Sequence, residues 1–226
     1  GGNPRHVLYC ESSRGGWAVS RNDLGKSEDS DGIMAQKDIK TRIVDAALHI
    51  AEENGWEGVR LCQVAEKLNI PLAGLHGHFR DLDAVADAWL GRGLDAMLAS
   101  RDKNFAACET RERLRILLLG WFDGLAGHRR VTGQMLAVKM YPPHPHHWAP
   151  MIFNLSRLIQ WLRDAAGLDA GGRRRQVEEI SLTAIFLATL VVWACDGTPD
   201  QERTRRFLDR RLGRADKTMA CLFGRV

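Results

Sequence analysis

The amino-acid sequence predicts an all-α protein. Apolar residues recur at intervals of three and four along most of the chain, which is the period of one face of an α-helix. Glycine, proline and asparagine interrupt this pattern repeatedly and divide it into nine expected helices. We find no strand pattern beyond the first 33 residues and no internal repeat. A chain of 226 residues with 45% hydrophobic and 27% charged side chains can bury a sizeable core.

Three of the expected helices are short and lie close together, at residues 36–54, 60–68 and 72–79. Asn54-Gly55 ends the first, and Asn69-Ile70-Pro71 ends the second, because proline lacks the N–H that the helical ladder needs. A helix followed by two short helices joined by a tight turn is the helix-turn-helix arrangement. The apolar stripes that should pack these helices are Ile43, Ala46, Ala47, Ile50 and Ala51, then Leu61, Val64, Ala65 and Leu68, then Leu72, Leu75 and Phe79.

Six further helices are expected downstream. Asp81 and Thr110 stand where N-capping side chains belong, and prolines at 142, 143 and 145 and the pair Gly171-Gly172 separate later helices. Pro199 stands at a first-turn position, where proline is favoured. The expected ranges are 81–103, 110–128, 131–141, 147–166, 173–195 and 199–223.

Composition indicates a soluble, cytoplasmic protein. The five cysteines are scattered and form no Cys-x-x-Cys pair, which suits a reducing compartment. No signal peptide is recognised, and the longest run that is apolar except for Thr189, Ala184–Ala194, is too short to span a bilayer. We therefore expect no transmembrane segment.

Residues 1–33 are rich in Gly, Ser, Asp and Arg and are expected to be an N-terminal extension, with Met34 as a plausible natural start. A small hairpin is the alternative for this extension. It would pair Val7-Leu8-Tyr9 with Trp17-Ala18-Val19 around residues 12–16.

Charge is unevenly distributed along the chain. The net charge is +4, yet residues 34–80 hold six basic and six acidic side chains, and residues 199–226 hold eight basic and four acidic ones. A neutral helix-turn-helix region is unexpected for a DNA-binding protein, whose affinity rests largely on phosphate neutralisation.

The end of the third helix, Leu75-His76-Gly77-His78-Phe79, resembles the Leu-Tyr-X-His-Phe sequence of TetR-type bacterial regulators. The order of the nine helices also matches that family. The resemblance implies a helix-turn-helix DNA-binding domain at 34–80 and a ligand-binding and dimerisation domain at 81–226. It further implies a homodimeric, ligand-responsive repressor that reads a palindromic operator in double-stranded DNA.

The third helix departs from the family pattern. Pro71-Leu72-Ala73-Gly74 replaces the usual Ser-Lys-Gly-Thr, and His76 replaces the usual Tyr, which leaves few side chains for reading bases. If the protein binds DNA, phosphate contacts are expected from the start of the first helix and from the second helix. At Gly74 and Gly77 the backbone is expected to approach the DNA closely. The expected DNA-binding residues are Lys40, Thr41, Arg42, Arg60, Gly74, His76 and Gly77.

A second resemblance covers about 25 residues near the C-terminus. Trp193 and the sequence Asp196-Gly197-Thr198-Pro199, followed by Phe207-Leu208-Asp209-Arg210-Arg211-Leu212, resemble a TetR-fold lipid-binding accessory family of ubiquinone biosynthesis. That resemblance implies an alternative function, lipid binding without DNA binding. The same stretch also fits a dimer helix in a four-helix interface. The expected dimerisation residues are Trp193, Phe207, Leu208, Leu212 and Met219.

Large apolar side chains gather in the middle helices, where the TetR family encloses an inducer. Trp and Met are favoured in adaptable apolar sites, although ordinary core packing explains most of these residues equally well. We expect an apolar small molecule or a lipid as ligand. The expected ligand-binding residues are Trp121, Met135, Met140, Trp148, Phe153 and Trp161.

No motif for catalysis is present: the sequence has no phosphate loop, no Gly-x-Ser-x-Gly and no His-Glu-x-x-His. The run His144-Pro145-His146-His147 could bind a metal, but a loop between two helices is the preferred interpretation. We therefore expect no enzyme, no catalytic residues, no cofactor and no metal.

Overall fold

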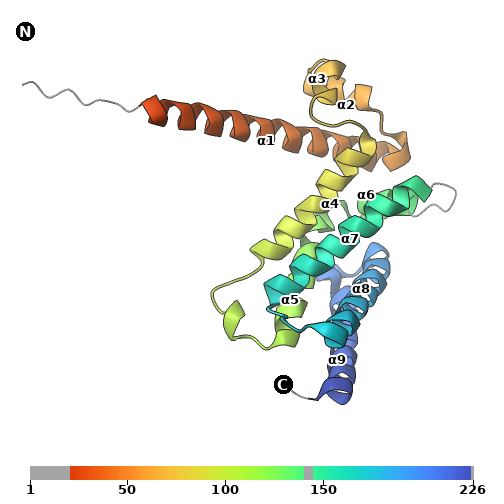
Figure 1. The fold of residues 1–226 in the computed structure, drawn as a ribbon. Coiled ribbons are helices and arrows are strands. Elements are labelled where there is room, and N and C mark those ends of the chain that lie inside the picture. Colours follow the sequence, from red (N-terminus) through yellow and green to blue (C-terminus); the bar gives the residue numbers. More distant parts are fainter. Residues whose placement is uncertain (1–20, 140–144, 225–226) are drawn as a thin grey trace, which may run out of the picture. The chain divides into compact units, whose positions relative to one another are not determined.

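The computed structural model describes the backbone of residues 21–139 and 145–224, and side chains from Gln36 onward except Lys37 and residues 140–151. The described residues form α-helices and short 3-10 helices and contain no strand (Figure 1). The all-α expectation is confirmed. The α-helices are α1 (Arg21–Asn54), α2 (Leu61–Leu68), α3 (Leu72–His76), α4 (Leu82–Ala99), α5 (Thr110–Leu125), α6 (Arg129–Lys139), α7 (Pro145–Ala166), α8 (Gly172–Ala194) and α9 (Glu202–Phe223). The 3-10 helices are η1 (Trp56–Gly58), η2 (Phe105–Ala107), η3 (Ala126–His128) and η4 (Pro199–Gln201).

Contacts divide the chain into two compact units, Gly1–Lys40 and Thr41–Val226. The second unit contains both the helix-turn-helix and the helices that follow it, so contacts within it join the two regions expected from the sequence. The hairpin considered for residues 7–19 lies outside the described residues.

The helix boundaries agree with the sequence to within a few residues, with three exceptions. Helix α1 begins at Arg21 instead of residue 36. Thr110 does not cap α5, because Glu109 is the N-cap and provides no side-chain bond. The last helix is divided, because Asp200 and Gln201, the last two residues of η4, adopt left-handed φ values of 50° and 56° just before α9. By contrast, Asp81 caps α4 as expected, accepting a bond of 2.7 Å from the N–H of Ala84.

The turn between α2 and α3 is closed by Asn69. Its φ of 54° and ψ of 44° are left-handed, a conformation that asparagine tolerates better than most residues. The N–H of Ile70 then donates to the carbonyl of Ala65 at 3.0 Å, which ends α2, and Pro71 precedes the first residue of α3. This turn fixes the direction of α3 relative to α2.

Helix α4 continues from the helix-turn-helix and packs closely on α5 (Figure 1). Glycines make this close approach possible. A Cβ on Gly93 would lie 2.7 Å from Nε1 of Trp121, and a Cβ on Gly124 would overlap the Cβ of Ala96. Any side chain at these positions would force the two helices apart.

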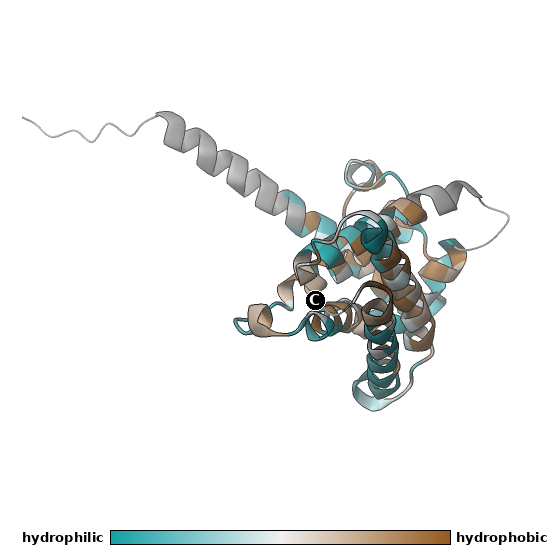
Figure 2. Cartoon of the chain, turned by 60° about the horizontal axis from the view of Figure 1, so that its bottom comes forward, coloured by the Kyte–Doolittle hydropathy of each residue, from teal (hydrophilic) through white to brown (hydrophobic). Residues whose placement is uncertain are grey.

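The core of the second unit includes an aromatic cluster formed by α5 and α8. Trp121 and Phe186 meet edge to face with ring centroids 5.0 Å apart, and Phe122 lies 5.6 Å from Trp193. Such geometry adds roughly 0.5–1.5 kcal/mol per pair to the burial of the rings. Figure 2 colours hydrophobic residues brown, and on the helices of this unit they lie among hydrophilic residues coloured teal.

Helix α8 is longer than the apolar run that marks it in the sequence. It has 23 residues, with a mean hydropathy of 1.7 over its most apolar 18 residues. By length and composition it could therefore cross a membrane, contrary to the expectation drawn from Ala184–Ala194 alone. The core helix of a globular protein meets the same test. Here Leu182, Phe186 and Trp193 are buried against neighbouring helices, and Glu178 forms a buried ion pair of 3.0 Å with Arg163.

The close packing of α4 on α5 can be tested with two glycine substitutions. Gly124→Ala should lower the free energy of unfolding by about 2 kcal/mol, because the added methyl overlaps Ala96. This corresponds to a fall in Tm of roughly 4–8 °C. Gly91→Ala is the matched control. Gly91 is exposed on α4 with nothing within 4 Å of an added Cβ, so alanine should stabilise the protein by about 0.5–1 kcal/mol. Thermal unfolding in which Gly124→Ala is neutral would contradict the packing.

Candidate functional site

The surface that could read DNA is the outer face of α3. Leu75 and Phe79 are buried, while Gly74, His76 and Gly77 are exposed as a DNA-reading surface requires. Leu72 was expected in the core, but 52% of it is exposed. Leu72 is exposed because a helix of five residues has room for only one buried stripe. Leu75 forms that stripe together with Phe79, which lies beyond the end of the helix.

The cationic residues expected to contact phosphates occupy different environments. Lys40 is exposed in the first compact unit, and Thr41 and Arg42 are exposed at the beginning of the second. Arg60 is the N-cap of α2, and its guanidinium donates to the carbonyls of Glu57 and Val59 at 2.8 and 3.2 Å. The side chain of Arg60 is therefore held beside the start of α2 by its own backbone.

Helix α6 and η3 join the helix-turn-helix to the rest of the second unit. Oε1 of Gln134 accepts a bond of 2.8 Å from the N–H of Trp56, and Nδ1 of His128 lies 3.0 Å from Oε1 of Glu52. Arg130 also forms an ion pair of 3.1 Å with Glu52. Burial opposes the ionisation of Glu52, but the hydrogen bonds from His128 and Arg130 outweigh it and hold the pKa of Glu52 below its usual range.

The same helix also contacts α4. Nε1 of Trp89 donates to Oγ1 of Thr132 at 2.8 Å, and the buried Lys139 lies 3.1 Å from Asp87 and 3.5 Å from Asp83. Sequence patterns gave no signal for these contacts, because each of them depends on which helices become neighbours in the fold.

The four expected ligand-binding residues whose side chains the structure describes are not brought together. Trp121 and Met135 are buried in the packed core, whereas 68% of Phe153 and 48% of Trp161 are exposed on α7. Met140 and the side chain of Trp148 lie outside the described residues. Phe153 and Trp161 therefore do not line an internal cavity with Trp121.

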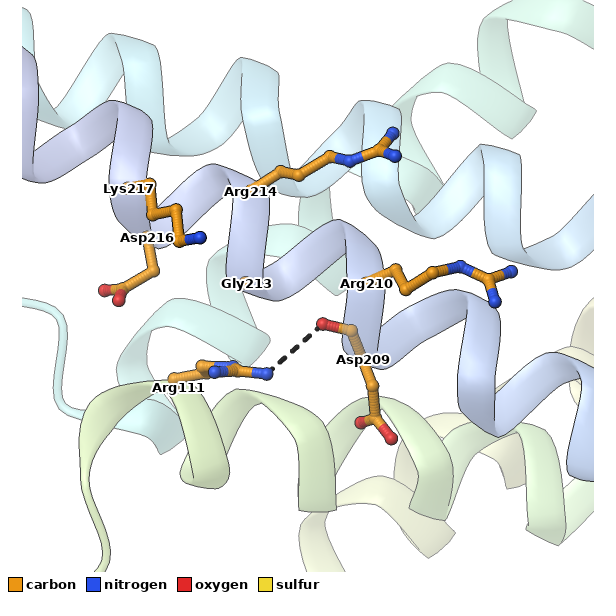
Figure 3. A pocket seen from close by; sticks show the side chains of 7 residues that line it. All are labelled: Arg111, Asp209, Arg210, Gly213, Arg214, Asp216 and Lys217. Atoms are coloured by element: carbon orange, nitrogen blue, oxygen red, sulfur yellow. Dashed lines mark hydrogen bonds between the residues drawn. The ribbon is translucent and has the colours of Figure 1, made fainter.

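A cavity of about 1040 Å³ lies elsewhere, among the start of α5, the loop between α7 and α8, the α8 side chains from Glu178 to Ile185, and the second half of α9. A groove of about 390 Å³ adjoins this cavity along α9, and the two share Arg111 and Asp216 in their linings (Figure 3). Neither was expected from the sequence, because the residues that form them come from four separate segments.

Most of the expected dimerisation residues are used inside the protomer. Trp193, Leu208 and Leu212 are buried, and Met219 lines the cavity just described. Phe207 is partly exposed, with the guanidinium of Arg211 4.9 Å from its ring centroid. An exposed apolar stripe lies on the opposite face of α8, within the apolar part of the sequence that favours a dimer. Its residues recur at intervals of four, three and four, namely Ile180, Ala184, Leu187 and Val191.

The second resemblance coincides with a hydrogen-bonded corner between α8 and α9. The buried Asp196 accepts bonds from the N–H and hydroxyl of Thr198 at 2.9 and 2.6 Å, and from those of Thr204 at 2.8 and 2.6 Å. Nε1 of Trp193 donates to Oε1 of Gln201 across the same corner. Burial opposes the ionisation of Asp196, but the four bonds outweigh it and hold its pKa well below its usual range.

Among the residues whose side chains are described, no group of three or more His, Cys, Asp or Glu residues could hold a metal ion. The side chains of the His144–His147 run lie outside the described residues.

The hydrogen bonds to Asp196 should make the free energy of unfolding depend on pH. A carboxyl whose pKa falls on folding stabilises the protein above its unfolded pKa, and this contribution is lost as the pH falls below about 4. Asp196→Asn should therefore lower the free energy of unfolding by about 3 kcal/mol at pH 7, because it removes charged hydrogen bonds and places an amide N–H₂ against donors. The deficit should shrink as the pH falls from 5 toward 2. Urea unfolding at several pH values measures it. Asp200→Asn, at an exposed carboxylate of the same corner, should change little. Equal effects of the two substitutions would refute the role of Asp196.

Comparisons with known proteins agree with this structure. Residues 177–219 match the COQ9 family, a segment that contains the α8–α9 corner. The repressor KstR of Mycolicibacterium smegmatis is 32% identical over 77 residues, and KstR of Rhodococcus jostii is 31% identical over 91 residues. These matches span 34% and 40% of this chain and about two fifths of each relative, 38% and 42%.

Solved structures match over a longer range. A TetR regulator from Rhodococcus sp. RHA1 has 15% identity and a TM-score of 0.56, covering 77% of this chain and 93% of its own, and shares the fold. A TetR transcriptional regulator from Nitrosomonas europaea is 35% identical with a TM-score of 0.71, and the alignment covers 79% of this chain and 98% of that one. The protein therefore belongs to the TetR family of transcriptional regulators.

Proposed function

We propose that this protein is a cytoplasmic, homodimeric repressor that binds a palindromic operator and releases it in response to a ligand. The observation that carries the proposal is the α2–turn–α3 unit, in which Asn69 sets the turn and α3 presents an exposed outer face. Within this proposal, residues 34–80 are the DNA-binding domain and 81–226 the ligand-binding and dimerisation domain. Residues 1–33 are an N-terminal extension.

Recognition of bases rests on few side chains. His76 can donate or accept a hydrogen bond, and the exposed Leu72 can contact a thymine methyl group in the major groove. Gly74 and Gly77 carry no side chain that would hold the backbone of α3 away from the DNA. Arg42 and Arg60 supply phosphate contacts, with Lys40 and Thr41 nearby in the sequence.

Affinity should be modest and should depend only weakly on salt. Each phosphate that the protein neutralises contributes a slope of about −0.9 in log K against log salt concentration. The helix-turn-helix region carries as many acidic as basic side chains, so only a few phosphates are neutralised per subunit.

Dimerisation through α8 fits the exposed apolar stripe of Ile180, Ala184, Leu187 and Val191. In the protomer 70% of Ile180 and 69% of Val191 are exposed, and a continuous apolar face of this kind usually marks an interface. Helix α9 packs beside α8 and contributes the partly exposed Phe207. Two copies of this pair would form a four-helix interface with twofold symmetry.

Control by an apolar or lipid ligand requires a route from the body to α3. Helix α6 supplies one, since its residues contact both the helix-turn-helix, through Gln134 and Arg130, and α4, through Thr132 and Lys139. A ligand that shifts α5, on which α4 packs, or α6 would change the position of α3. The alternative, a lipid-binding accessory without DNA binding, is less favoured. The COQ9 match is confined to 43 residues at 177–219, whose most specific residues build a structural corner.

DNA recognition by α3 can be tested with His76→Ala. This substitution should weaken binding to a duplex from the region upstream of the protein's own gene by roughly 10- to 100-fold, because it removes the main hydrogen-bonding side chain of α3. Fluorescence anisotropy at fixed salt measures the change. His49→Ala alters an exposed histidine on α1 of the same domain and should bind like the parent. If His76→Ala also binds like the parent, α3 is not the reading surface as placed here.

The dimer interface can be tested with Val191→Glu. The residue is exposed in the protomer, so folding should be unaffected, while an unpaired charge buried between two copies should weaken dimerisation at least about a hundredfold. Sedimentation at micromolar concentration should then show a folded monomer. Ala99→Glu introduces the same charge at an exposed position of α4 and should leave the dimer intact. A Val191→Glu variant that sediments as a dimer would exclude this face. Leu212→Glu, at a buried position, should unfold the protomer instead.

A further inference from the structure

The cavity between α5, α8 and α9 has one apolar wall, and charged and polar residues make up much of the remaining lining. The apolar wall is formed by Leu114 of α5, Leu182 and Ile185 of α8, and Leu212, Ala215 and Met219 of α9. Its volume of about 1040 Å³ is just above the range of about 300–1000 Å³ that is usual for small-ligand sites. The apolar wall therefore has room beside it for an alkyl chain.

The mouth of the cavity carries an excess of unpaired cations. Within the linings of the cavity and the adjoining groove, Glu178 is paired with Arg174 at 3.2 Å and Asp209 with Arg115 at 2.7 Å. Three other lining carboxylates have no ion pair among the described residues: Glu109, Asp169 and Asp216. Five lining cations also have no ion pair among the described residues, so cations outnumber carboxylates there: Arg111, Arg113, Arg210, Arg214 and Lys217.

Arg111 and Arg113 line the cavity at the start of α5, close in sequence to Leu114 of the apolar wall. Arg111 reaches from α5 toward α9 and donates to the carbonyl of Asp209 at 3.3 Å, which leaves its other N–H groups available (Figure 3). Arg113 donates from one terminal nitrogen to Oγ1 of Thr110 at 3.1 Å, while its buried Nε has no hydrogen-bond partner among the described residues. A buried N–H without a partner is costly, and an anionic oxygen would satisfy it.

We propose that this cavity binds a single-chain amphiphile with an anionic head. Its alkyl chain lies among Leu114, Leu182 and Met219, and its carboxylate or phosphate lies at Arg111 and Arg113. Guanidinium groups bind both kinds of head through paired N–H···O bonds. The cations Arg210, Arg214 and Lys217 of the groove add positive potential at the entrance (Figure 3).

The position of this cavity gives the ligand a means of control. Arg111 and Arg113 lie in the first turn of α5, and the same helix packs on α4 through Gly124. A ligand that ties the start of α5 to α9 would bias the position of α4. The inference thus deepens the proposed ligand response and rests on it, but ligand binding is measured without DNA, so that failure of either proposal can be recognised separately.

Isothermal titration of the full chain with dodecanoate, dodecyl phosphate and dodecanol tests the proposal. One of the two anions should bind at least about tenfold more tightly than dodecanol, and the tighter one identifies the head as carboxylate or phosphate. Arg111→Gln and Arg113→Gln should each weaken binding of that anion at least about tenfold and leave dodecanol unchanged. Arg203→Gln, which removes an exposed cation of α9 outside both linings, should bind like the parent.

Two cavity-filling variants locate the alkyl chain. Ala215→Trp and Met219→Trp should each abolish binding of anion and alcohol alike, and thermal unfolding identifies which of them remains folded. The proposal is overturned if neither anion binds, if dodecanol binds as tightly as both anions, if the two arginine variants bind like the parent, or if a folded cavity-filling variant still binds.

Discussion

The close contact between α4 and α5 is the constraint on which the rest of the structure depends. Helix α4 is the direct continuation of the helix-turn-helix, and Gly93 and Gly124 let it approach α5 more closely than any larger residue would allow. Because α5 also carries Trp121 and Phe122 of the core and the arginines at the cavity mouth, a displacement of α5 must displace α4. Contacts of α6 with Glu52 and Trp56 add a second connection to the same domain.

The sequence predicted the fold well because helical periodicity and capping are local. The stripe of Ile43, Ala47 and Ile50 is buried as expected, and Asp81 caps α4. The sites were harder to predict, because they depend on which helices become neighbours. Helix α8 is apolar on two faces, and spacing alone does not tell which one packs inside the protomer. The structure buries Leu182, Phe186 and Trp193 and leaves Ile180 and Val191 exposed. The cavity at Arg111 was missed for the same reason.

The two family resemblances now have separate physical explanations. The TetR resemblance extends over the whole arrangement of helices, with 35% identity to a regulator over 79% of the chain. The COQ9 resemblance is concentrated where Asp196 accepts bonds from Thr198 and Thr204 and where Trp193 bonds Gln201. Those residues fix the angle between α8 and α9. Their role in this chain is structural, so the match at this corner does not by itself favour lipid binding over transcription regulation.

The claim that this protein reads DNA through α3 is tested most directly by selecting bound sequences from a pool of random duplexes with the purified protein at low salt. Our account predicts enrichment of one palindromic sequence with half-sites about one helical turn apart or a multiple of it, since a twofold dimer places two reading helices in successive major grooves. It also predicts that the His76→Ala variant fails to enrich that sequence. Recovery of no preferred sequence at low salt would contradict the account.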